Sequence, residues 1–490
     1  MMMKEPNPAN SGAVKKIFIR VASVLGLTAA IVALTFLTIA FDLRSFAAAA
    51  SVVTARENAL NASFILGAIF AFTVAVYLYY KLDAKTYIGK QNNAVLLPPI
   101  IIVSIICCFF ASEINVYLRP YCLCSMLSVF LIGRRHALVN TIYFAILMML
   151  IDSVSTGVVF LFDRELIVSF LLTVITGAAA VFMLDGAGSR IRVVLTSVVL
   201  SIPALLAAFG LELYSGYYKL LIGVDAAFVS GILAAVLTTV ILPIFESVFR
   251  VVTTFRLAEL TDHKQKLLKE LSERAPGTFN HTVIVAMIAE ACSNAIGENP
   301  LLARACAYYH DVGKLKNPEM FTENQTGYNP HDDLSPELST DIIRAHARDG
   351  AALIRKCRLP EVIAETAEQH HGTMPIRYFY VKAQKYTDGK LDISRFCYPG
   401  PKPRTKINAI IMLSDACEAR VRSLKDRNYD NVDKAVGEMI EERLDMDQFT
   451  ECDITIKELN IIKNTITNSL AGVYHDRVKY PKLKIGGKNA

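Results

Sequence analysis

Charged residues are scarce in this 490-residue chain: Asp, Glu, Lys and Arg make up 20% of it, while 53% is hydrophobic. A wholly soluble globular protein carries more charge and fewer apolar residues. The scarcity is uneven, because long uncharged runs fill the first half and the acids, bases and histidines gather in the second. The sequence therefore predicts a membrane portion followed by a soluble one.

A disulfide framework is also missing. The ten cysteines show no paired spacing, several lie in apolar runs, and none forms a CxxC metal-binding pair. This argues against a disulfide-stapled scaffold and indicates a reducing compartment for the soluble half. The net charge of +6 is modest, and basic residues beside a membrane account for it better than binding to a nucleic-acid polymer does.

Eight apolar runs approach or exceed the length of about 20 residues that a helix needs to cross a bilayer. They cover 17–41, 61–82, 94–112, 116–133, 137–161, 165–185, 191–213 and 220–249. For the first run a cleaved signal peptide is the alternative, with Ala47-Ala48-Ala49 as a candidate cleavage site. The apolar stretch is longer than a normal signal core, which favours an uncleaved anchor.

Basic residues collect at every second connection between these runs, and the positive-inside rule makes that side cytoplasmic. An even number of spans then places both ends of the chain, and the soluble half, in the cytoplasm. The basic positions are Lys15, Lys16, Lys81, Lys85, Lys90, Arg134, Arg135, Arg190, Arg192, Arg250 and Arg256. The alternate connections carry Glu113, Asp163-Arg164-Glu165 and a Tyr-rich turn at 214–218.

Asp152 lies inside the apolar run 137–161. An ionisable residue within a membrane is costly to bury, so it is a functional candidate by default. The sequence leaves two roles open: a hydrogen bond that packs helices together, and a part in sensing a ligand.

The soluble half is set off by a polar segment from Arg256 to Arg274, which predicts a connecting helix, and by the Pro276-Gly277 break. Thr278 or Asn280 then caps the first helix of the soluble domain. The expected organisation is a cytoplasmic tail, first anchor and short outer loop (1–60), a seven-transmembrane helical domain (61–250), a helical linker (251–275), a soluble all-α domain (276–475) and a basic tail (476–490).

Six of the nine histidines lie between His281 and Asp415. A single histidine on an apolar helix face is usually a core residue satisfied by one hydrogen bond. Here seven titratable residues from five helix segments have aliphatic neighbours at helical spacing, so all should face one core. Burying them without a shared cation would cost on the order of several kcal/mol apiece. The set predicts a metal centre formed by His281, His310, Asp311, His346, His370, His371 and Asp415.

Imidazole and carboxylate ligands suit Fe, Mn and Zn. Asp311 directly follows His310. A histidine binds one ion, whereas the two oxygens of an aspartate can bridge two ions, which gives the short metal–metal spacing of a two-metal phosphoryl site.

His…His-Asp…Asp resembles the signature of the HD superfamily of metal phosphohydrolases, and the extra His346 and His370-His371 resemble its two-metal members that open cyclic dinucleotides. Three segments are similar to the seven-transmembrane HD family of PgpH-type cyclic-di-AMP phosphodiesterases, and the resemblance covers roughly residues 61–475. They are HDVGKLKNPEMFTENQTGYNPHDDLSP at 310–336, HHGT at 370–373 and FCYPGPKPRTK at 396–406. Gly372-Thr373-Met374-Pro375 stands where the cyclic-di-GMP class carries a GYP motif, which argues against that substrate.

The resemblance implies an all-α protein of the bacterial plasma membrane, in which a polytopic helical membrane domain precedes an all-α HD phosphohydrolase domain in the cytoplasm. It implies two divalent metal ions, Mn or Fe. His281, His310, Asp311 and Asp415 would hold one ion, with Asp311 bridging to a second held by His346 and His370. The ions would clamp the phosphodiester and lower the pKa of a bridging water, whose hydroxide attacks in line and linearises cyclic-di-AMP to pApA.

Other residues are expected to contact the substrate. His371 is either a further metal ligand or a hydrogen-bond donor to the phosphate. Lys314, a compact charge near Asp311, is the natural catalytic phosphate contact, with a surface lysine as its alternative. Arg404 and Lys406 either contact the second phosphate or the adenine, or belong to a solvated basic loop. His331 and Asp332 are expected to stabilise the loop over 315–335 rather than bind metal.

One departure from the family is that only about residues 42–60 fill the place of a large extracytoplasmic domain, so sensing by that domain is not carried over. Two alternative functions remain: hydrolysis of another signalling nucleotide, and a membrane receptor that binds nucleotide without turnover. A receptor would be indicated by a broken ligand set, and this set is complete. The sequence leaves the native metal and the oligomeric state, including a homodimer, open.

Overall fold

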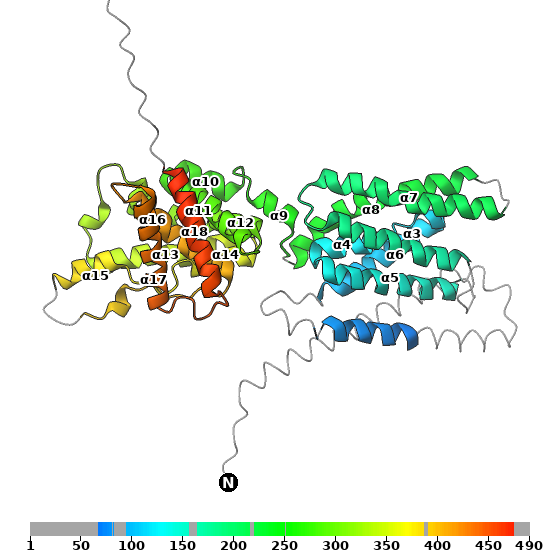
Figure 1. The fold of residues 1–490 in the computed structure, drawn as a ribbon, viewed down its shortest axis with the longest axis horizontal. Helices are drawn as coiled ribbons and strands as arrows, with labels where there is room; N and C mark the ends of the chain where they lie inside the picture. Colours follow the sequence, from blue (N-terminus) through cyan, green and yellow to red (C-terminus); the bar gives the residue numbers. More distant parts are fainter. Residues whose placement is uncertain are drawn as a thin grey trace, which may run out of the picture. The chain divides into compact units, whose positions relative to one another are not determined.

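The computed structural model describes residues 67–80, 82, 95–155, 164–215, 220–249, 251–386 and 391–474. These residues form helices and no strand, with one isolated bridge between Pro375 and Cys397, so the all-α fold is confirmed. The chain divides into two compact units between Phe255 and Arg256 (Figure 1). The expected first anchor at 17–41 and the basic tail at 476–490 lie outside the described residues.

The first unit is a bundle of apolar helices (Figure 1). Five of its helices, α3 and α5 to α8, are long and apolar enough to cross a membrane. Large side chains such as Phe182, Leu195 and Val248 are more than half exposed on the bundle surface, as hydrocarbon contact requires. The helices are Gly67–Tyr80, α3 Leu97–Ile114, η2 Val116–Leu118, α4 Leu123–Leu131, α5 Arg134–Ser155, α6 Arg164–Leu184, α7 Arg190–Ser215 and α8 Leu220–Phe249.

The apolar run at 116–133 does not form one long helix. It is split into η2 and the nine-residue α4, because Pro120 holds Arg119 in an extended conformation (φ −52°, ψ 130°). The guanidinium of Arg119 donates to both carboxylate oxygens of Asp152 on α5, at 2.5 and 2.9 Å, and this ion pair is buried. Asp152 therefore makes the helix-packing contact, one of its two expected roles.

The second unit packs short and medium helices around α11, α13 and α16 (Figure 1). Pro300 and Pro336 occupy the first turns of α12 and α13, where a missing N–H costs nothing, and Asn299 and Ser335 cap those turns. The helices are α9 Thr254–Leu260, α10 Lys266–Arg274, α11 Pro276–Ala295, α12 Pro300–Tyr309, η3 Val312–Lys316, η4 Pro318–Met320, η5 Thr322–Asn324, η6 Pro330–Asp332, α13 Pro336–Lys356, α14 Glu361–Gln369, α15 Arg377–Gln384, η7 Ile393–Phe396, α16 Lys406–Arg422, α17 Tyr429–Asp445 and α18 Ile456–Val473.

Two boundary predictions differ from the structure. The connecting segment 256–274 is not one helix, since a turn separates α9 from α10. The first helix of the soluble domain begins at Pro276 with Ala275 as its N-cap, so the prediction of Thr278 or Asn280 as the cap is wrong. Thr278 lies inside the first turn, where its hydroxyl donates to Glu323 at 3.0 Å.

Candidate active site

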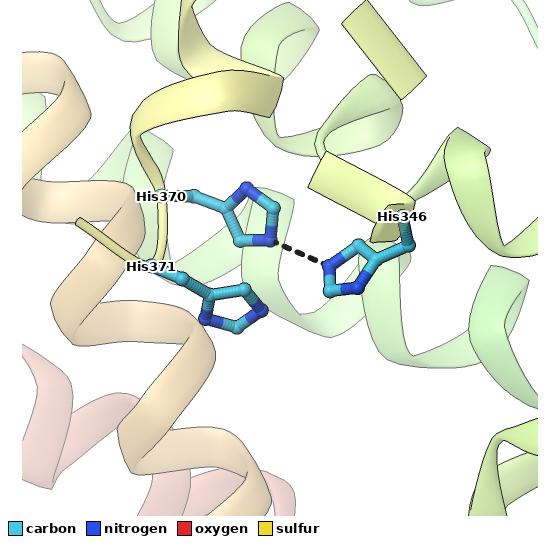
Figure 2. A group of neighbouring side chains, drawn as sticks. All are labelled: His346, His370 and His371. Atoms are coloured by element: carbon cyan, nitrogen blue, oxygen red, sulfur yellow. Dashed lines mark hydrogen bonds between the residues drawn. The ribbon is translucent and has the colours of Figure 1, made fainter. Parts of the chain in front are cut away.

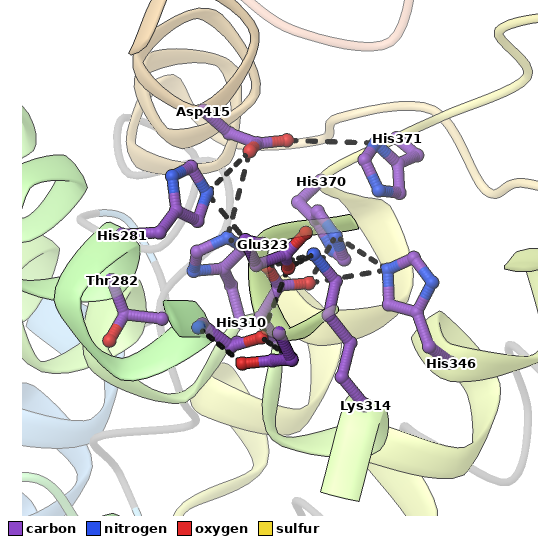
Figure 3. A network of polar contacts seen from close by, with 12 residues as sticks. His281, Thr282, His310, Lys314, Glu323, His346, His370, His371 and Asp415 are labelled. Carbon is purple, nitrogen blue, oxygen red and sulfur yellow. Dashed lines mark hydrogen bonds and ion pairs between the residues drawn. The ribbon is translucent and has the colours of Figure 1, made fainter. Parts of the chain in front are cut away.

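Helices from distant parts of the second unit bring all seven expected ligands together, and Figure 3 labels all of them except Asp311. Six of them are buried, and His371 is the most exposed, with 25% of its side chain accessible. His281 comes from α11, His310 and Asp311 from the junction of α12 and η3, His346 from α13, His370 and His371 from the end of α14, and Asp415 from α16.

Four imidazoles have their Nδ1 atoms held by the surrounding protein. The Nδ1–H groups of His310, His346 and His370 donate to the carbonyl three residues earlier, at 2.6, 2.5 and 2.8 Å. His281 Nδ1 lies 2.5 Å from Glu418 Oε2. Bonds of this kind fix the tautomer and ring orientation of metal-binding histidines. In His310, His346 and His370 they leave the Nε2 lone pair free, whereas His281 Nε2 also contacts Asp415 Oδ1 at 2.9 Å. In all four, Nε2 faces the interior of the cluster.

Asp311 lies at the centre of these Nε2 atoms. Its Oδ1 is 3.3 Å from His346 Nε2 and 3.7 Å from His370 Nε2. Its Oδ2 is 3.3 Å from His310 Nε2 and 3.9 Å from His281 Nε2. Each carboxylate oxygen therefore faces its own pair of imidazoles, which is the arrangement that a bridging aspartate needs.

Asp415 closes one side of the cluster. Its Oδ1 is 2.9 Å from His281 Nε2 and 3.9 Å from His310 Nε2, and its Oδ2 is 3.7 Å from His371 Nδ1. His346, His370 and His371 form a second group on the other side, with their rings around one space (Figure 2).

The cluster fits divalent metal ions. His310 Nε2 and both oxygens of Asp311 are buried without a hydrogen-bond partner in the described structure, although Lys314 Nζ lies at ion-pair distance, 2.8 Å, from Asp311 Oδ2. His346 Nε2 and His370 Nε2 face each other at 3.2 Å, and their Nδ1 protons are already used. Two such lone pairs repel unless a cation lies between them, and burying unpaired polar groups is costly.

The carboxylates are held in their charged form. Burial opposes ionisation of Asp311, but Lys314 and His310 outweigh it and hold the pKa of this carboxyl well below its usual range. Burial also opposes ionisation of Asp415, and the hydrogen bond from His281 outweighs it, so its pKa is well below the usual range. Charged carboxylates are the form that binds a metal ion.

Two imidazoles are held neutral. Burial lowers the pKa of His370 to about 3, with repulsion from His310 adding to the shift, and burial also lowers the pKa of His346. His281 differs: burial would lower its pKa, but hydrogen bonds to Asp415 and Glu418 raise it to about 9. Neutral imidazole is the form that offers a lone pair to a metal.

The cluster opens onto a cavity of about 350 Å³, within the size range of small-molecule sites. Lys314 lines it, and its ammonium lies between Asp311 and Glu323, at 2.8 Å from a carboxylate oxygen of each. Only 12% of this side chain is accessible, so Lys314 is not a surface lysine. The ring of His371 stacks on Tyr398 at the cavity wall, with centroids 4.2 Å apart.

Arg404 and Lys406 do not lie among the described residues that line the cavity. Arg404 is 61% exposed and pairs with Glu451 at 3.0 Å, while Lys406 pairs with Glu458 at 2.6 Å. Their contact with substrate stays a prediction. His331 is buried and its Nε2 lies 2.9 Å from the Met320 carbonyl, which fits its expected role in the loop over 315–335.

Sequence reasoning missed several residues of the site. Glu418 and Arg422 follow Asp415 at three and seven residues, so helical spacing could have placed both on the metal-facing side of α16. Tyr398 lies in the segment FCYPGPKPRTK, whose similarity to the PgpH-type family could have marked it as a site residue. Glu323 and Arg443 reach the site from η5 and from α17, and no local pattern marks them.

Comparisons with known proteins agree with the two units. Residues 59–253 match a family described as "7TM receptor with intracellular HD hydrolase", and residues 278–420 match the HD domain. "Cyclic-di-AMP phosphodiesterase PgpH" of Listeria monocytogenes is 35% identical over 431 residues, and the protein of the same name from Bacillus subtilis is 37% identical over 430 residues. These alignments cover 85% and 84% of this chain, and the chain spans 58% of the length of both relatives.

Two crystal structures of the L. monocytogenes PgpH HD domain also resemble this chain. One is 45% identical, covers 43% of this chain and 100% of its own, and has a TM-score of 0.42. The other, in complex with cyclic-di-AMP, is 46% identical, covers 44% and 99%, and has the same TM-score of 0.42. From the two family matches and the relatives, residues 59–253 resemble the membrane domain of seven-transmembrane receptors with an intracellular HD hydrolase, and residues 278–420 form an HD domain.

Proposed function

We propose that this protein is a metal-dependent phosphodiesterase that hydrolyses cyclic-di-AMP to pApA. The observation that carries the proposal is the position of Asp311, whose two oxygens face separate imidazole pairs beneath an open cavity. The substrate follows from the two relatives of this chain, both named as cyclic-di-AMP phosphodiesterases.

Each residue of the cluster has a separate task in this reaction. His281, His310 and Asp415 would hold one metal ion, His346 and His370 would hold the other, and Asp311 would contribute one oxygen to each group. When bound, a pair of divalent ions, Mn or Fe, neutralises phosphate charge and supplies hydroxide at neutral pH. The protein itself keeps Asp311 ionised through Lys314 and fixes the imidazole rings through their Nδ1 contacts.

Two residues at the cavity are placed to act on the phosphate. Lys314 Nζ lies beside Asp311, so a phosphate held at the metals is within reach of its charge. His371 is partly exposed to the cavity and is held by its stacking on Tyr398, which suits a hydrogen bond to a phosphate oxygen. Both contacts are compatible with in-line attack on the diester.

We place the catalytic unit in the cytoplasm and the helical bundle in the plasma membrane. Arg134 at the start of α5 and Arg190 at the start of α7 belong to the basic side of the bundle, and the chain leaves α8 for the soluble unit through Arg256. Under the positive-inside rule these residues face the cytoplasm.

The test compares hydrolysis of cyclic-di-AMP, cyclic-di-GMP and a guanosine polyphosphate by the full-length protein in detergent with Mn or Fe. Cyclic-di-AMP should be converted to pApA, and a variant with both His310→Ala and Asp311→Ala should lose turnover while keeping the helical content of the protein. Wild-type rates in that variant would mean that the site is misassigned. Turnover of another nucleotide alone would assign a different substrate, and binding without turnover would indicate a receptor.

A further inference from the structure

The cavity holds two arginines that the metal cluster does not use. Arg422 and Arg443 line it together with Lys314, and these three are the cations among the described lining residues that are not histidines. A cyclic dinucleotide carries two phosphodiesters, and the metal centre binds the one that reacts. The other phosphate remains charged inside a cavity whose remaining acids would repel it.

Arg443 lines the cavity and keeps one donor without a partner in the described structure. Its side chain is only 12% exposed, and its Nε is buried without a hydrogen-bond partner in the described structure. One terminal nitrogen pairs with Glu442 and also lies 3.4 Å from the Met439 carbonyl. A buried N–H without an acceptor is costly, and an anion in the cavity would supply one.

Arg422 lies on the same face of α16 as the metal ligand Asp415. The cavity-lining residues of this helix are Met412, Asp415, Ala416, Ala419 and Arg422, which is helical spacing. The two alanines leave room above the helix between the metal cluster and the arginine. At a rise of 1.5 Å per residue, Arg422 follows Asp415 by about 10 Å along the helix.

The neighbours of Arg422 leave its positive charge available to an anion in the cavity. Its side chain is 39% exposed, and its nearest acid is Glu418 at 3.7 Å, which also accepts from Tyr474 and lies against His281. Lys314, in contrast, is enclosed between Asp311 and Glu323 next to the reacting position. The two arginines are therefore the groups that can receive a second anion.

We propose that Arg422 and Arg443 bind the second, non-reacting phosphate of the dinucleotide. This inference rests on the proposed function. The planar guanidinium presents paired N–H donors that match phosphate oxygens, which makes arginine better suited than lysine to this task. The pair gives the site a preference for substrates with two phosphates over simple diesters.

The test measures steady-state hydrolysis of cyclic-di-AMP and of bis(p-nitrophenyl) phosphate, a diester with one phosphate, by full-length protein. Arg443→Gln and Arg422→Gln should each raise KM for cyclic-di-AMP by about 10- to 100-fold, as expected for a lost charge-assisted hydrogen bond. Neither should change kcat/KM for the single diester. Arg443→Lys should restore part of the affinity for the dinucleotide.

Arg420→Gln is the matched control, because Arg420 lies on α16, pairs with Glu438 of α17 at 3.7 Å and does not line the cavity. It should leave both substrates unaffected. Metal content and thermal unfolding of each variant show whether the fold is intact, and Arg422→Gln carries the test if Arg443→Gln does not fold.

Unchanged KM for cyclic-di-AMP in both variants, or an equal loss on both substrates, would overturn the second-phosphate site while leaving the proposed function standing. Wild-type protein that cleaves the single diester but not cyclic-di-AMP would instead overturn the proposed function, and this inference with it.

Discussion

At the scale of single residues, Glu418 holds the imidazole of His281, a proposed metal ligand. Its carboxylate contacts His281 Nδ1 at 2.5 Å, and its side chain is fully buried. Glu418→Gln keeps the shape but removes the charge that makes the imidazole a stronger ligand. We expect metal affinity, measured by titration of the metal-free protein, to fall about 10- to 100-fold.

Tyr474→Phe is the graded control for that change. It removes the hydrogen bond of 2.7 Å to Glu418 Oε1 and leaves the contact with His281 in place. The loss of affinity should be smaller than that in Glu418→Gln. Equal affinity in wild type and Glu418→Gln would show that this carboxylate does not tune the ligand.

The ligand residues could be predicted from the sequence because each carries helical periodicity and an unusual residue type on an apolar face. His310 and Asp311 are adjacent, and His346 and Asp415 each have aliphatic residues one turn away. Arg443 could not be predicted, since its role depends on how α17 packs beside α16. The same limit applies to Lys314, because the sequence does not distinguish a phosphate contact from a surface lysine, whereas the contact with Glu323 shows that the side chain is enclosed.

At the scale of elements, the metal cluster depends on the close approach of η3 to α13. A Cβ added at Gly313 would lie 1.9 Å from the His346 carbonyl oxygen and 2.6 Å from Gly350 N, both backbone atoms. Gly313→Ala must therefore move η3, with Asp311, away from His346. We expect a loss of at least about 1–3 kcal/mol in the free energy of unfolding, together with weaker metal binding.

Gly437→Ala is the control for Gly313→Ala. A Cβ at Gly437 in α17 meets only the end of the Lys463 side chain, at 3.5 Å. Alanine is favoured over glycine inside a helix by about 1 kcal/mol, so this variant should be as stable as wild type or more stable. If chemical denaturation ranks the two variants in the opposite order, the close contact is not what holds η3.

At the break between η2 and α4, Arg119 forms a buried ion pair with Asp152. Removing one partner leaves an uncompensated buried charge, so Asp152→Asn or Arg119→Leu should each destabilise the bundle by about 3–5 kcal/mol. The double variant with Arg119→Leu and Asp152→Leu should recover most of this loss, because no charge is left unpaired. Thermal unfolding of the detergent-solubilised protein measures the series.

A double variant as unstable as the single ones would indicate that the pair has a role beyond mutual neutralisation. Ser112 and Ser169, which accept from Arg119 at 2.5 and 3.3 Å, would then be the next residues to change. The sequence marked the run 116–133 as one span because its composition is apolar. The contacts with Asp152, Ser112 and Ser169 show that Arg119 is stabilised inside the bundle.

At the scale of the whole molecule, the two units are stabilised by different means. The bundle buries apolar side chains and the Arg119–Asp152 pair, whereas the second unit gathers seven candidate metal ligands at its centre, six of them buried. Composition alone separated the two, since uncharged runs and the histidine-rich half do not overlap. Because the two units are stabilised differently, we expect them to unfold in separate transitions, which one calorimetric experiment can measure.

Removal of metal should destabilise the second unit alone. An ion that binds only the folded state adds about 2.7 kcal/mol at a concentration of one hundred times its Kd, which corresponds to a shift of roughly 5–10 °C for a unit of this size. We therefore expect a chelator to lower the unfolding temperature of the second unit in calorimetry of the full-length protein. The unfolding temperature of the helical bundle should not change. Calorimetry suits this chain because it contains no tryptophan for fluorescence.

A variant with His346→Ala and His370→Ala should no longer respond fully to the chelator, because it lacks the ligands on one side of Asp311. Before chelation, the second unit of this variant should unfold at a lower temperature than that of metal-bound wild type. The chelator should then lower its unfolding temperature by less than it does in wild type. If chelation shifts the transition of this variant as much as that of wild type, then the ion that stabilises the fold does not lie between Asp311 and these two imidazoles. The two-metal arrangement would then have to be abandoned in favour of the single group of His281, His310 and Asp415.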